Sequence, residues 1–197
     1  SKNATFSILQ CTTAYPTKPE EYGLNIINEL KNRYDVPIGF SDKSKITTLK
    51  EAFEAKIGKE NVIYAKGSEI LEEREINQIL QSDGGTMIHT ENEEEKLTQY
   101  LKEAKEAAKQ ADVIVLAIGE HYRQSGEACS RANIDISNIQ KRLLNELAKL
   151  NKKIVAIMFN GRPIVLRDIS EKVNGLLEAW FPGTEGANAI TDIIFGD

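Results

Sequence analysis

The sequence predicts an α/β domain: a three-layer, doubly wound, mostly parallel sheet of about six strands with helices on both faces. Apolar runs of strand length alternate with amphipathic segments of helical period along the whole chain. The two strongest runs, 112–118 and 153–159, are almost continuously apolar, which is typical of parallel strands covered on both faces. The 197 residues suffice for one large domain, so we expect residues 1–197 to form a single α/β unit.

The first half of the chain supplies three short strands and the helices between them. The expected strands are 6–11, 36–40 and 61–65, and the expected helices are 17–34, 47–57, 69–81 and 91–110. Thr17, Pro19 and Glu20 form a helix start, with a hydroxyl N-cap, a proline in the first turn and a glutamate at the capping-box position. Pro37 places the second strand's beginning at a position that needs no N–H donor. This half therefore reads as repeated β–α units.

The second half carries the strongest strands and, after each, a loop of distinctive sequence. The strands are 112–118, 153–159 and 175–181, and helices are expected around the leucines of 143–150 and over 187–195. Ligands of a doubly wound sheet bind beyond the carboxyl ends of its strands. We therefore expect any site in the loops after Ile118, Phe159 and Phe181.

Composition excludes several classes of function. The net charge is −5 and the pI about 5.3, and no basic stripe is present, so nucleic acid is not an expected partner. No apolar run approaches the roughly 20 residues that span a bilayer, and the N-terminus has no signal-peptide pattern; we expect a soluble protein, cytoplasmic on recombinant expression. Cys11 and Cys129 are expected as reduced thiols. Without a glycine-rich phosphate loop, no cofactor is predicted.

Three loop segments resemble one enzyme family. They are Gly119-Glu120-His121 through Ser125-Gly126-Glu127-Ala128-Cys129-Ser130-Arg131, then Phe159-Asn160-Gly161-Arg162-Pro163, then Ala179-Trp180-Phe181-Pro182-Gly183 with Glu185-Gly186. In this order and spacing they resemble the C-terminal domain of family-three glycoside hydrolases of β-glucosidase type, over about residues 44–197. That resemblance implies a flavodoxin-like sheet that works beside an N-terminal barrel.

By this resemblance, Glu127 occupies the position of the general acid/base. Retaining glycoside hydrolysis needs two carboxylates about 5–5.5 Å apart, one as nucleophile and one as proton donor. The family's nucleophile lies on the barrel, which this chain lacks. We therefore expect Glu127 to be vestigial here and the isolated chain not to be an enzyme. Arg131 and Arg162 are expected to tie down their own loops, and Trp180 to pack in the core.

The first 42 residues resemble a different family. Ile8-Leu9-Gln10-Cys11-Thr12-Thr13-Ala14-Tyr15-Pro16, together with Gly39-Phe40-Ser41-Asp42, is similar to a β-α-β fragment of the sialic acid synthase barrel. That family continues with a histidine that helps to bind the catalytic metal, whereas Lys43 stands here, and a protonated ammonium ligates no metal. His89 and His121 lie far apart without ligand spacing, so no metal site is predicted.

The chain resembles two families, yet its strands and helices alternate without a linker between the two parts. This suggests a chimera, engineered or recombined. In this interpretation residues 1–42 come from a barrel and residues 43–197 from the hydrolase domain. Two alternatives stay open: an accessory half of a retaining β-glucosidase that supplies the acid/base and works only with a barrel domain, and a module that binds a sugar or nucleotide. No obligatory partner is predicted, although the surface that faced the missing barrel can promote a homodimer.

Overall fold

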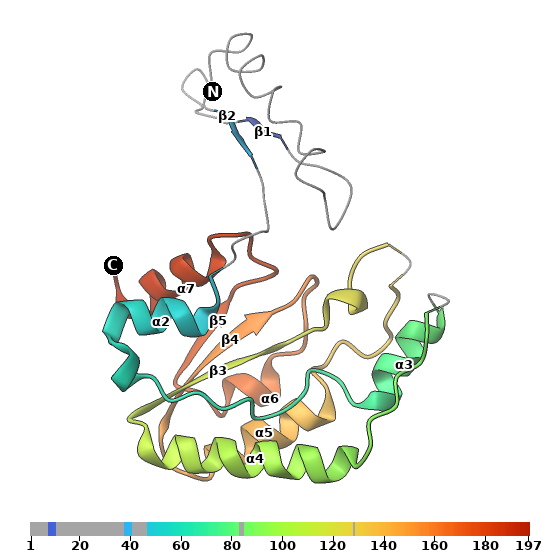
Figure 1. Cartoon of the computed structure of the whole chain (residues 1–197), viewed down its shortest axis with the longest axis horizontal. Coiled ribbons are helices and arrows are strands. Elements are labelled where there is room, and N and C mark those ends of the chain that lie inside the picture. The colour runs from blue at the N-terminus through green and yellow to red at the C-terminus, as the bar shows by residue number, and fades with distance from the viewer. Residues whose placement is uncertain (1–7, 11–37, 41–46, 83–84, 128) are drawn as a thin grey trace. The chain divides into compact units, whose positions relative to one another are not determined.

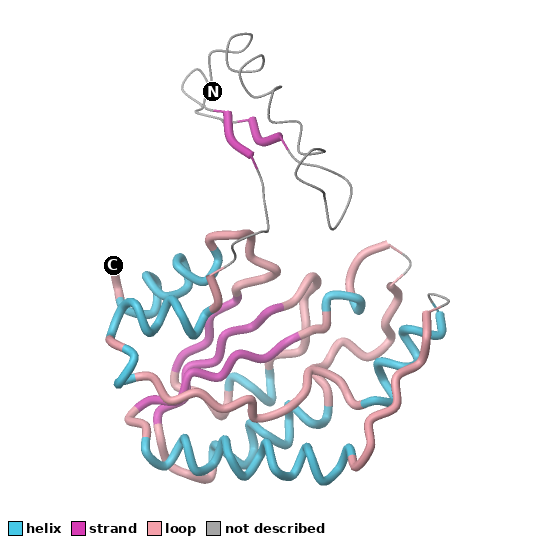
Figure 2. The backbone as a smooth tube through the Cα atoms, viewed as in Figure 1, coloured by secondary structure: helices cyan, strands magenta, loops and turns pink. Residues whose placement is uncertain are grey.

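The structure, a computed structural model, describes residues 8–10, 38–40, 47–82, 85–127 and 129–197. Its contacts divide the chain into two compact units, residues 1–48 and 49–197. In the first unit, β1 (Ile8–Gln10) and β2 (Ile38–Phe40) pair in parallel (Figure 2). The single domain expected over 1–197 stays a prediction.

The second unit contains a three-stranded parallel sheet in the order β3-β4-β5. Its strands are β3 (Val113–Gly119), β4 (Lys153–Phe159) and β5 (Gly175–Glu178). Val113 lies opposite Lys153, and Val155 lies opposite Gly175. The predicted α/β class and parallel pairing are confirmed.

Helices cover both faces of this sheet, as Figure 1 shows. The helices α4 (Glu93–Gln110), α5 (Asn138–Ala148) and α6 (Arg167–Ser170) lie on one face, and α2 (Leu49–Ile57) and α7 (Gly186–Phe195) lie on the other. Phe53 of α2 packs edge-on against Phe195 of α7, with ring centroids 5.4 Å apart. The remaining helices are α3 (Glu73–Ser82) and the 3-10 turns η2 (Lys59–Asn61) and η3 (Tyr122–Gln124).

The main core lies between the sheet and the α4–α5 face. Alternate residues of β3 point into it, namely Ile114, Leu116 and Ile118, and they meet leucines of α5 and alanines of α4. On the opposite face of β3, Val113 and Val115 are 45% and 36% exposed. The α2–α7 layer thus leaves β3 uncovered on that face, an unusual exposure for so apolar a strand.

The strand predicted at 61–65 does not form. Residues 62–69 run without regular secondary structure, and Ile63 and Tyr64 are 50% and 65% exposed. A strand is defined by backbone hydrogen bonds to a neighbouring strand. In the described part of the chain, no strand pairs with this segment. Among the described residues this sheet has three strands, where about six were predicted. The last strand is also shorter than predicted and ends at Glu178 rather than at residue 181.

Candidate functional site

Glu120 is the centre of the loops beyond the carboxyl ends of β3 and β4. It follows β3 directly and is only 5% exposed. Its Oε1 lies 2.7 Å from Nη1 of Arg131 and 3.1 Å from Nε of Arg162, and its Oε2 accepts a hydrogen bond from the Gly161 N–H at 3.0 Å. One buried carboxylate therefore serves as the shared counter-ion of two guanidinium groups and binds the β4 loop, and these partners compensate its burial.

Both arginines also donate hydrogen bonds to backbone carbonyl groups of the loop that follows β3. Arg131 donates from Nη2 to the Asp135 carbonyl at 2.8 Å. Arg162 donates from Nη2 to the carbonyls of both Gln124 and Cys129, the latter at 2.6 Å. Arg131 ties down its own loop as predicted, whereas Arg162, from the loop after β4, holds the loop after β3 instead. We call Glu120, Arg131 and Arg162 the Glu120 clamp.

Two glycines allow the loops to approach each other this closely. At Gly119, φ is 149° and an added Cβ would lie 2.0 Å from the Phe159 carbonyl oxygen. At Gly161, an added Cβ would lie 2.3 Å from Oγ of Ser125. A larger residue at either position therefore separates the β3 loop from the β4 loop, because backbone and short side chains have no room to yield.

Glu127 lies in an exposed turn between the two carbonyl groups that Arg162 binds. The preceding Gly126 has φ 122°, a backbone conformation that favours glycine. No described residue makes a hydrogen bond or ion pair with the Glu127 carboxylate. The Cys129 thiol, free as expected, donates to the Arg123 carbonyl at 3.2 Å. The structure thus presents Glu127 outward on a turn whose flanks are held by one guanidinium.

His121 stabilises the start of the same loop. Its Nδ1 accepts from the Arg123 N–H at 3.3 Å, and its own N–H donates to Oε1 of Gln124 at 2.9 Å. Burial, and to a lesser extent the charge of Arg123, lowers the pKa of His121 below its ordinary value. The neutral imidazole is therefore the form that caps the 3-10 turn η3.

His89, the other histidine of the chain, lies outside the β3 loop. It lies in the chain segment that precedes α4, and its Nδ1 is 3.4 Å from a carboxylate oxygen of Glu73. Within the described ranges, no three His, Cys, Asp or Glu side chains are placed to hold a metal ion.

Trp180 is not part of the core, so that prediction is wrong. Its side chain is 47% exposed, that of Phe181 is 44% exposed, and Trp180 has φ 54°, which is rare for a large residue. Because β5 ends at Glu178, Trp180 lies in the loop beyond the strand. The two aromatic rings therefore border the carboxyl-end loops.

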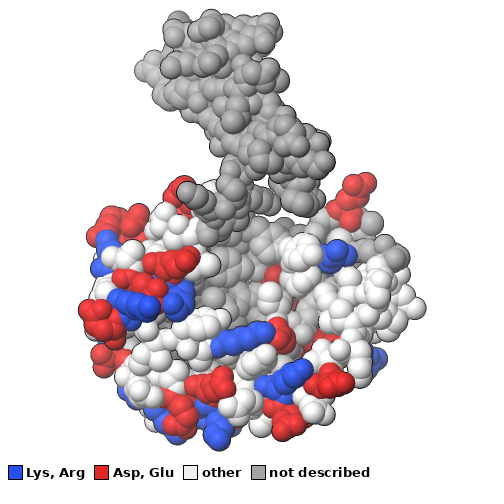
Figure 3. Space-filling model, viewed as in Figure 1, with Lys and Arg blue, Asp and Glu red and all other residues white. Residues whose placement is uncertain are grey.

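The surface of the second unit carries mixed charge. In Figure 3, basic and acidic side chains alternate over the face shown, with no broad area of one sign. No helix among the described residues is long and apolar enough to cross a membrane.

Comparison with known proteins identifies the family. Residues 12–197 match the family described as glycosyl hydrolase family 3 C-terminal domain. The chain belongs to this family. The periplasmic β-glucosidase of Salmonella typhimurium is 38% identical over 137 residues, 69% of this chain and 17% of the relative. A β-xylosidase of Formosa agariphila is 36% identical over 95 residues, 48% of this chain and 13% of the relative.

A solved structure supports the fold of this family 3 C-terminal domain. The GH3 β-glucosidase of Bifidobacterium adolescentis matches 98% of the chain with a TM-score of 0.59 at 22% identity, over 23% of its own length. The chain thus spans about a sixth of the length of the first curated relative and under a quarter of this enzyme.

Two expectations are corrected by these comparisons. The family is one of glycoside hydrolases and the relatives are named as such, which overturns the expectation that the chain stands outside enzyme function. The family match begins at residue 12 and so includes most of the segment 1–42, which the sequence alone ascribed to a sialic acid synthase. The comparisons give no support to a synthase fragment or to a chimera.

Two buried polar residues were not predicted as functional from the sequence: Glu120, and Gln140 of α5, whose side-chain amide bonds to Gly119 and Ile70. The sequence did contain a signal for Glu120. A glutamate directly after a continuously apolar strand is expected to be buried, and a buried carboxylate needs a counter-ion or hydrogen-bond donors. Gln140 offered no such signal, since a glutamine on a helix is common.

Proposed function

We propose that this chain is the C-terminal domain of a retaining β-glycosidase of β-glucosidase type, and that Glu127 is the general acid/base of an active site completed by a barrel domain. The observation that carries the proposal is the placement of Glu127. It projects from an exposed turn that the Glu120 clamp holds on both sides. A carboxylate held in this way can meet a substrate bound against another domain.

In the proposed mechanism, the barrel's carboxylate attacks the anomeric carbon while Glu127 gives its proton to the glycosidic oxygen, so that the leaving group departs as a neutral alcohol. The resulting glycosyl-enzyme is hydrolysed when Glu127, now ionised, takes a proton from water and the water oxygen displaces the first carboxylate. A second carboxyl group about 5–5.5 Å away is required, and it belongs to the barrel. The other residues of the β3 loop position Glu127. They do not exclude water from it by themselves.

The name of the Salmonella typhimurium relative, a β-glucosidase, favours β-glucosides as the substrate class. The turn and its clamp contain no feature that selects one sugar over another. We therefore assign the choice of sugar to the barrel.

The test supplies the barrel domain that the proposed active site requires. The chain is combined with the barrel of a family 3 β-glucosidase and assayed with an unactivated aryl β-glucoside, and then again as Glu127→Gln. We expect the variant to lose about 10²–10⁴-fold in rate, the usual contribution of a general acid/base. With a dinitrophenyl leaving group, which needs no proton, formation of the glycosyl-enzyme should be nearly unchanged and azide should accelerate its breakdown.

The matched control is Glu171→Gln, the same change at an exposed glutamate between α6 and β5, at the opposite end of the strands from these loops. This control should retain full activity. If the complemented Glu127→Gln protein hydrolyses the unactivated glucoside at the wild-type rate, Glu127 is not the acid/base.

A further inference from the structure

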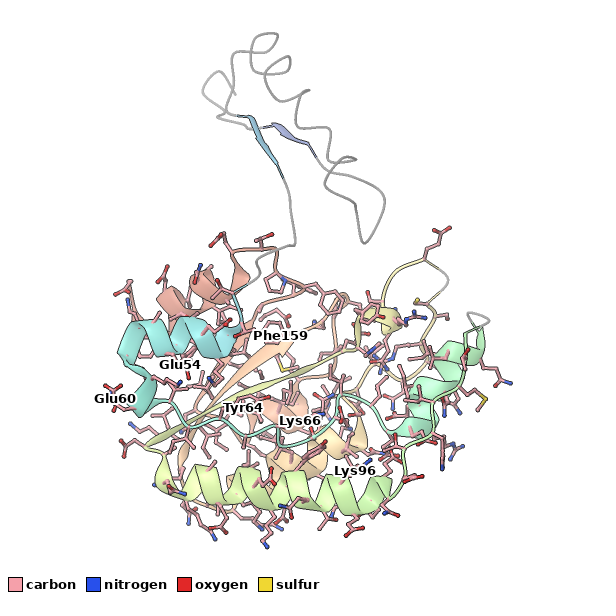
Figure 4. All side chains as sticks on the ribbon, viewed as in Figure 1. Glu54, Glu60, Tyr64, Lys66, Lys96 and Phe159 are labelled. Atoms are coloured by element: carbon pink, nitrogen blue, oxygen red, sulfur yellow. The ribbon has the colours of Figure 1, made fainter. Side chains whose placement is uncertain are left out.

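Asn160 and Gly161 form an Asn-Gly pair in the turn directly after β4. Phe159, labelled in Figure 4, is the last residue of that strand. Asparagine is among the thermolabile residues of proteins, because it can deamidate. A following glycine favours this reaction, since it has no side chain to shield its backbone nitrogen and its backbone is free to bend. The turn therefore places a reactive pair beside the Glu120 clamp.

Deamidation uses the backbone nitrogen of Gly161 as its nucleophile. That nitrogen loses its proton and attacks Cγ of Asn160, the Cγ–Nδ2 bond breaks, and ammonia leaves with the proton. Water then opens the resulting five-membered succinimide at one of its two carbonyl carbons, which gives aspartate or isoaspartate. The reaction consumes one water, releases one ammonia and involves no oxidation. Negative charge develops first on the Gly161 nitrogen and then on Oδ1 of Asn160.

The Glu120 clamp opposes the first step. The Gly161 N–H donates to Oε2 of Glu120 at 3.0 Å. This hydrogen bond stabilises the protonated nitrogen. The carboxylate is only 2% exposed, so its charge is little screened and makes negative charge on the neighbouring nitrogen unfavourable. The nucleophile is therefore held in its unreactive form.

The surroundings of the Asn160 side chain oppose the second step. Asn160 is 0% exposed, and its Nδ2 donates to the Arg162 carbonyl at 2.8 Å. Its Oδ1 is buried and has no hydrogen-bond donor among the described residues. Charge that develops on this oxygen has nothing to stabilise it, which is the opposite of an oxyanion hole. In the folded chain, both atoms on which charge must develop are thus unfavourable places for it.

Neither product of the reaction fits the folded turn. Aspartate at this position puts an ionised carboxylate into a site of 0% exposure with no donor for Oδ1, and it removes the donor to the Arg162 carbonyl. Isoaspartate lengthens the backbone by one CH₂ group. The turn has no room for it, because a Cβ on Gly161 would already lie 2.3 Å from Oγ of Ser125. A chain that has reacted here therefore does not close the clamp again.

We propose that Asn160-Gly161 is a latent modification site, which deamidates only while the Glu120 clamp is open, and that the reaction turns a transient opening into permanent loss of the fold. In the folded chain, the rate of deamidation is the rate of the open chain multiplied by the fraction of time that the clamp is open. The clamp thus protects its own turn from chemical damage.

Asn174 and Gly175, at the start of β5, provide an internal comparison. They are the same pair, but Asn174 is exposed and its Oδ1 accepts a hydrogen bond from the Ile154 N–H at 2.9 Å. Among the described residues, no carboxylate accepts from the Gly175 N–H. The reaction at Asn174 is therefore independent of Glu120 as long as the chain stays folded.

Peptide mapping by mass spectrometry, after incubation of the full chain, measures deamidation at both asparagines. In unfolding guanidinium chloride, Asn160 and Asn174 should react at similar rates. In the folded wild type, Asn160 should react at least about 100-fold more slowly than in guanidinium chloride. Glu120→Gln should accelerate the reaction at Asn160 at least about tenfold without changing that at Asn174. The matched control Glu95→Gln, at an exposed glutamate of α4, should change neither.

Two outcomes of this experiment overturn the proposal. One is a reaction at Asn160 in the folded wild type as fast as in guanidinium chloride, and the other is an unchanged rate at Asn160 in Glu120→Gln. Where Glu120→Gln accelerates Asn174 as well, that variant has unfolded, and Asn160→Asp decides, because it introduces the product directly. Its midpoint of urea unfolding should fall well below that of the matched Asn174→Asp, and equal midpoints overturn the proposal. None of these outcomes depends on Glu127 or on glycosidase activity.

Discussion

Replacing Glu120 by glutamine tests the clamp most directly. Glutamine has nearly the same shape and retains an oxygen that can accept the Gly161 N–H, but it removes the charge that Arg131 and Arg162 share. The carboxylate is 2% exposed, whereas the two guanidinium side chains are 17% and 23% exposed. The variant therefore leaves two largely buried cations without a counter-ion.

The expected cost follows from these exposures. Removing one partner of a buried ion pair costs about 3–5 kcal/mol, because the remaining charge stays buried without compensation. Water reaches about a fifth of each arginine side chain and screens part of that charge, so we expect the lower end, about 3 kcal/mol, in the free energy of unfolding. For a domain of this size, that corresponds to a fall in Tm of about 6–12 °C.

Urea unfolding followed by circular dichroism measures this difference. Glu127→Gln is the matched control, because it makes the same change in the same loop on a carboxylate that is exposed and has no described partner; we expect a change below about 0.5 kcal/mol. A loss of less than about 1 kcal/mol in Glu120→Gln would show that the clamp does not hold the loops.

Two further predictions concern neighbours of the clamp. Gly119→Ala places a Cβ 2.0 Å from the Phe159 carbonyl oxygen at φ 149°, and it should destabilise the fold by about 3 kcal/mol or more in the same urea assay, whereas little change would mean that β3 and β4 separate freely. The pKa of His121 is lowered in the folded state, so the unfolded chain binds the proton first; this contribution to stability is present above the ordinary pKa and is lost as the pH falls through the folded value. Wild type should therefore lose more stability than His121→Asn between about pH 8 and about pH 5, and parallel curves would exclude the effect.

Much of the architecture could be predicted from local sequence. The continuously apolar runs 112–118 and 153–159 predicted two parallel strands, and β3 and β4 form there, although one face of β3 is exposed. Periodicity succeeds here because one element alone decides which of its faces is apolar. The loop motifs likewise indicated the correct family.

The failures share one physical cause, which is dependence on a distant neighbour. Asn61 to Ala65 has the composition of a strand, but a strand forms only when another backbone pairs with it. Trp180 has the composition of a core residue, but β5 ends two residues before it and leaves the ring half-exposed. The interpretation of residues 1–42 is a separate case: the family match begins at residue 12, and the comparisons give no support to a synthase fragment.

The sequence by itself determined the α/β class, the parallel strands and the family of the loop motifs, because these depend on residues close together in the chain. Only the tertiary structure decided that Glu120 meets Arg131 and Arg162, and that Gln140 joins Gly119 to Ile70. Those contacts join residues that are 11 to 70 positions apart. Glu120 meets Arg162 because parallel pairing brings the carboxyl ends of β3 and β4 together, and no local pattern encodes that meeting.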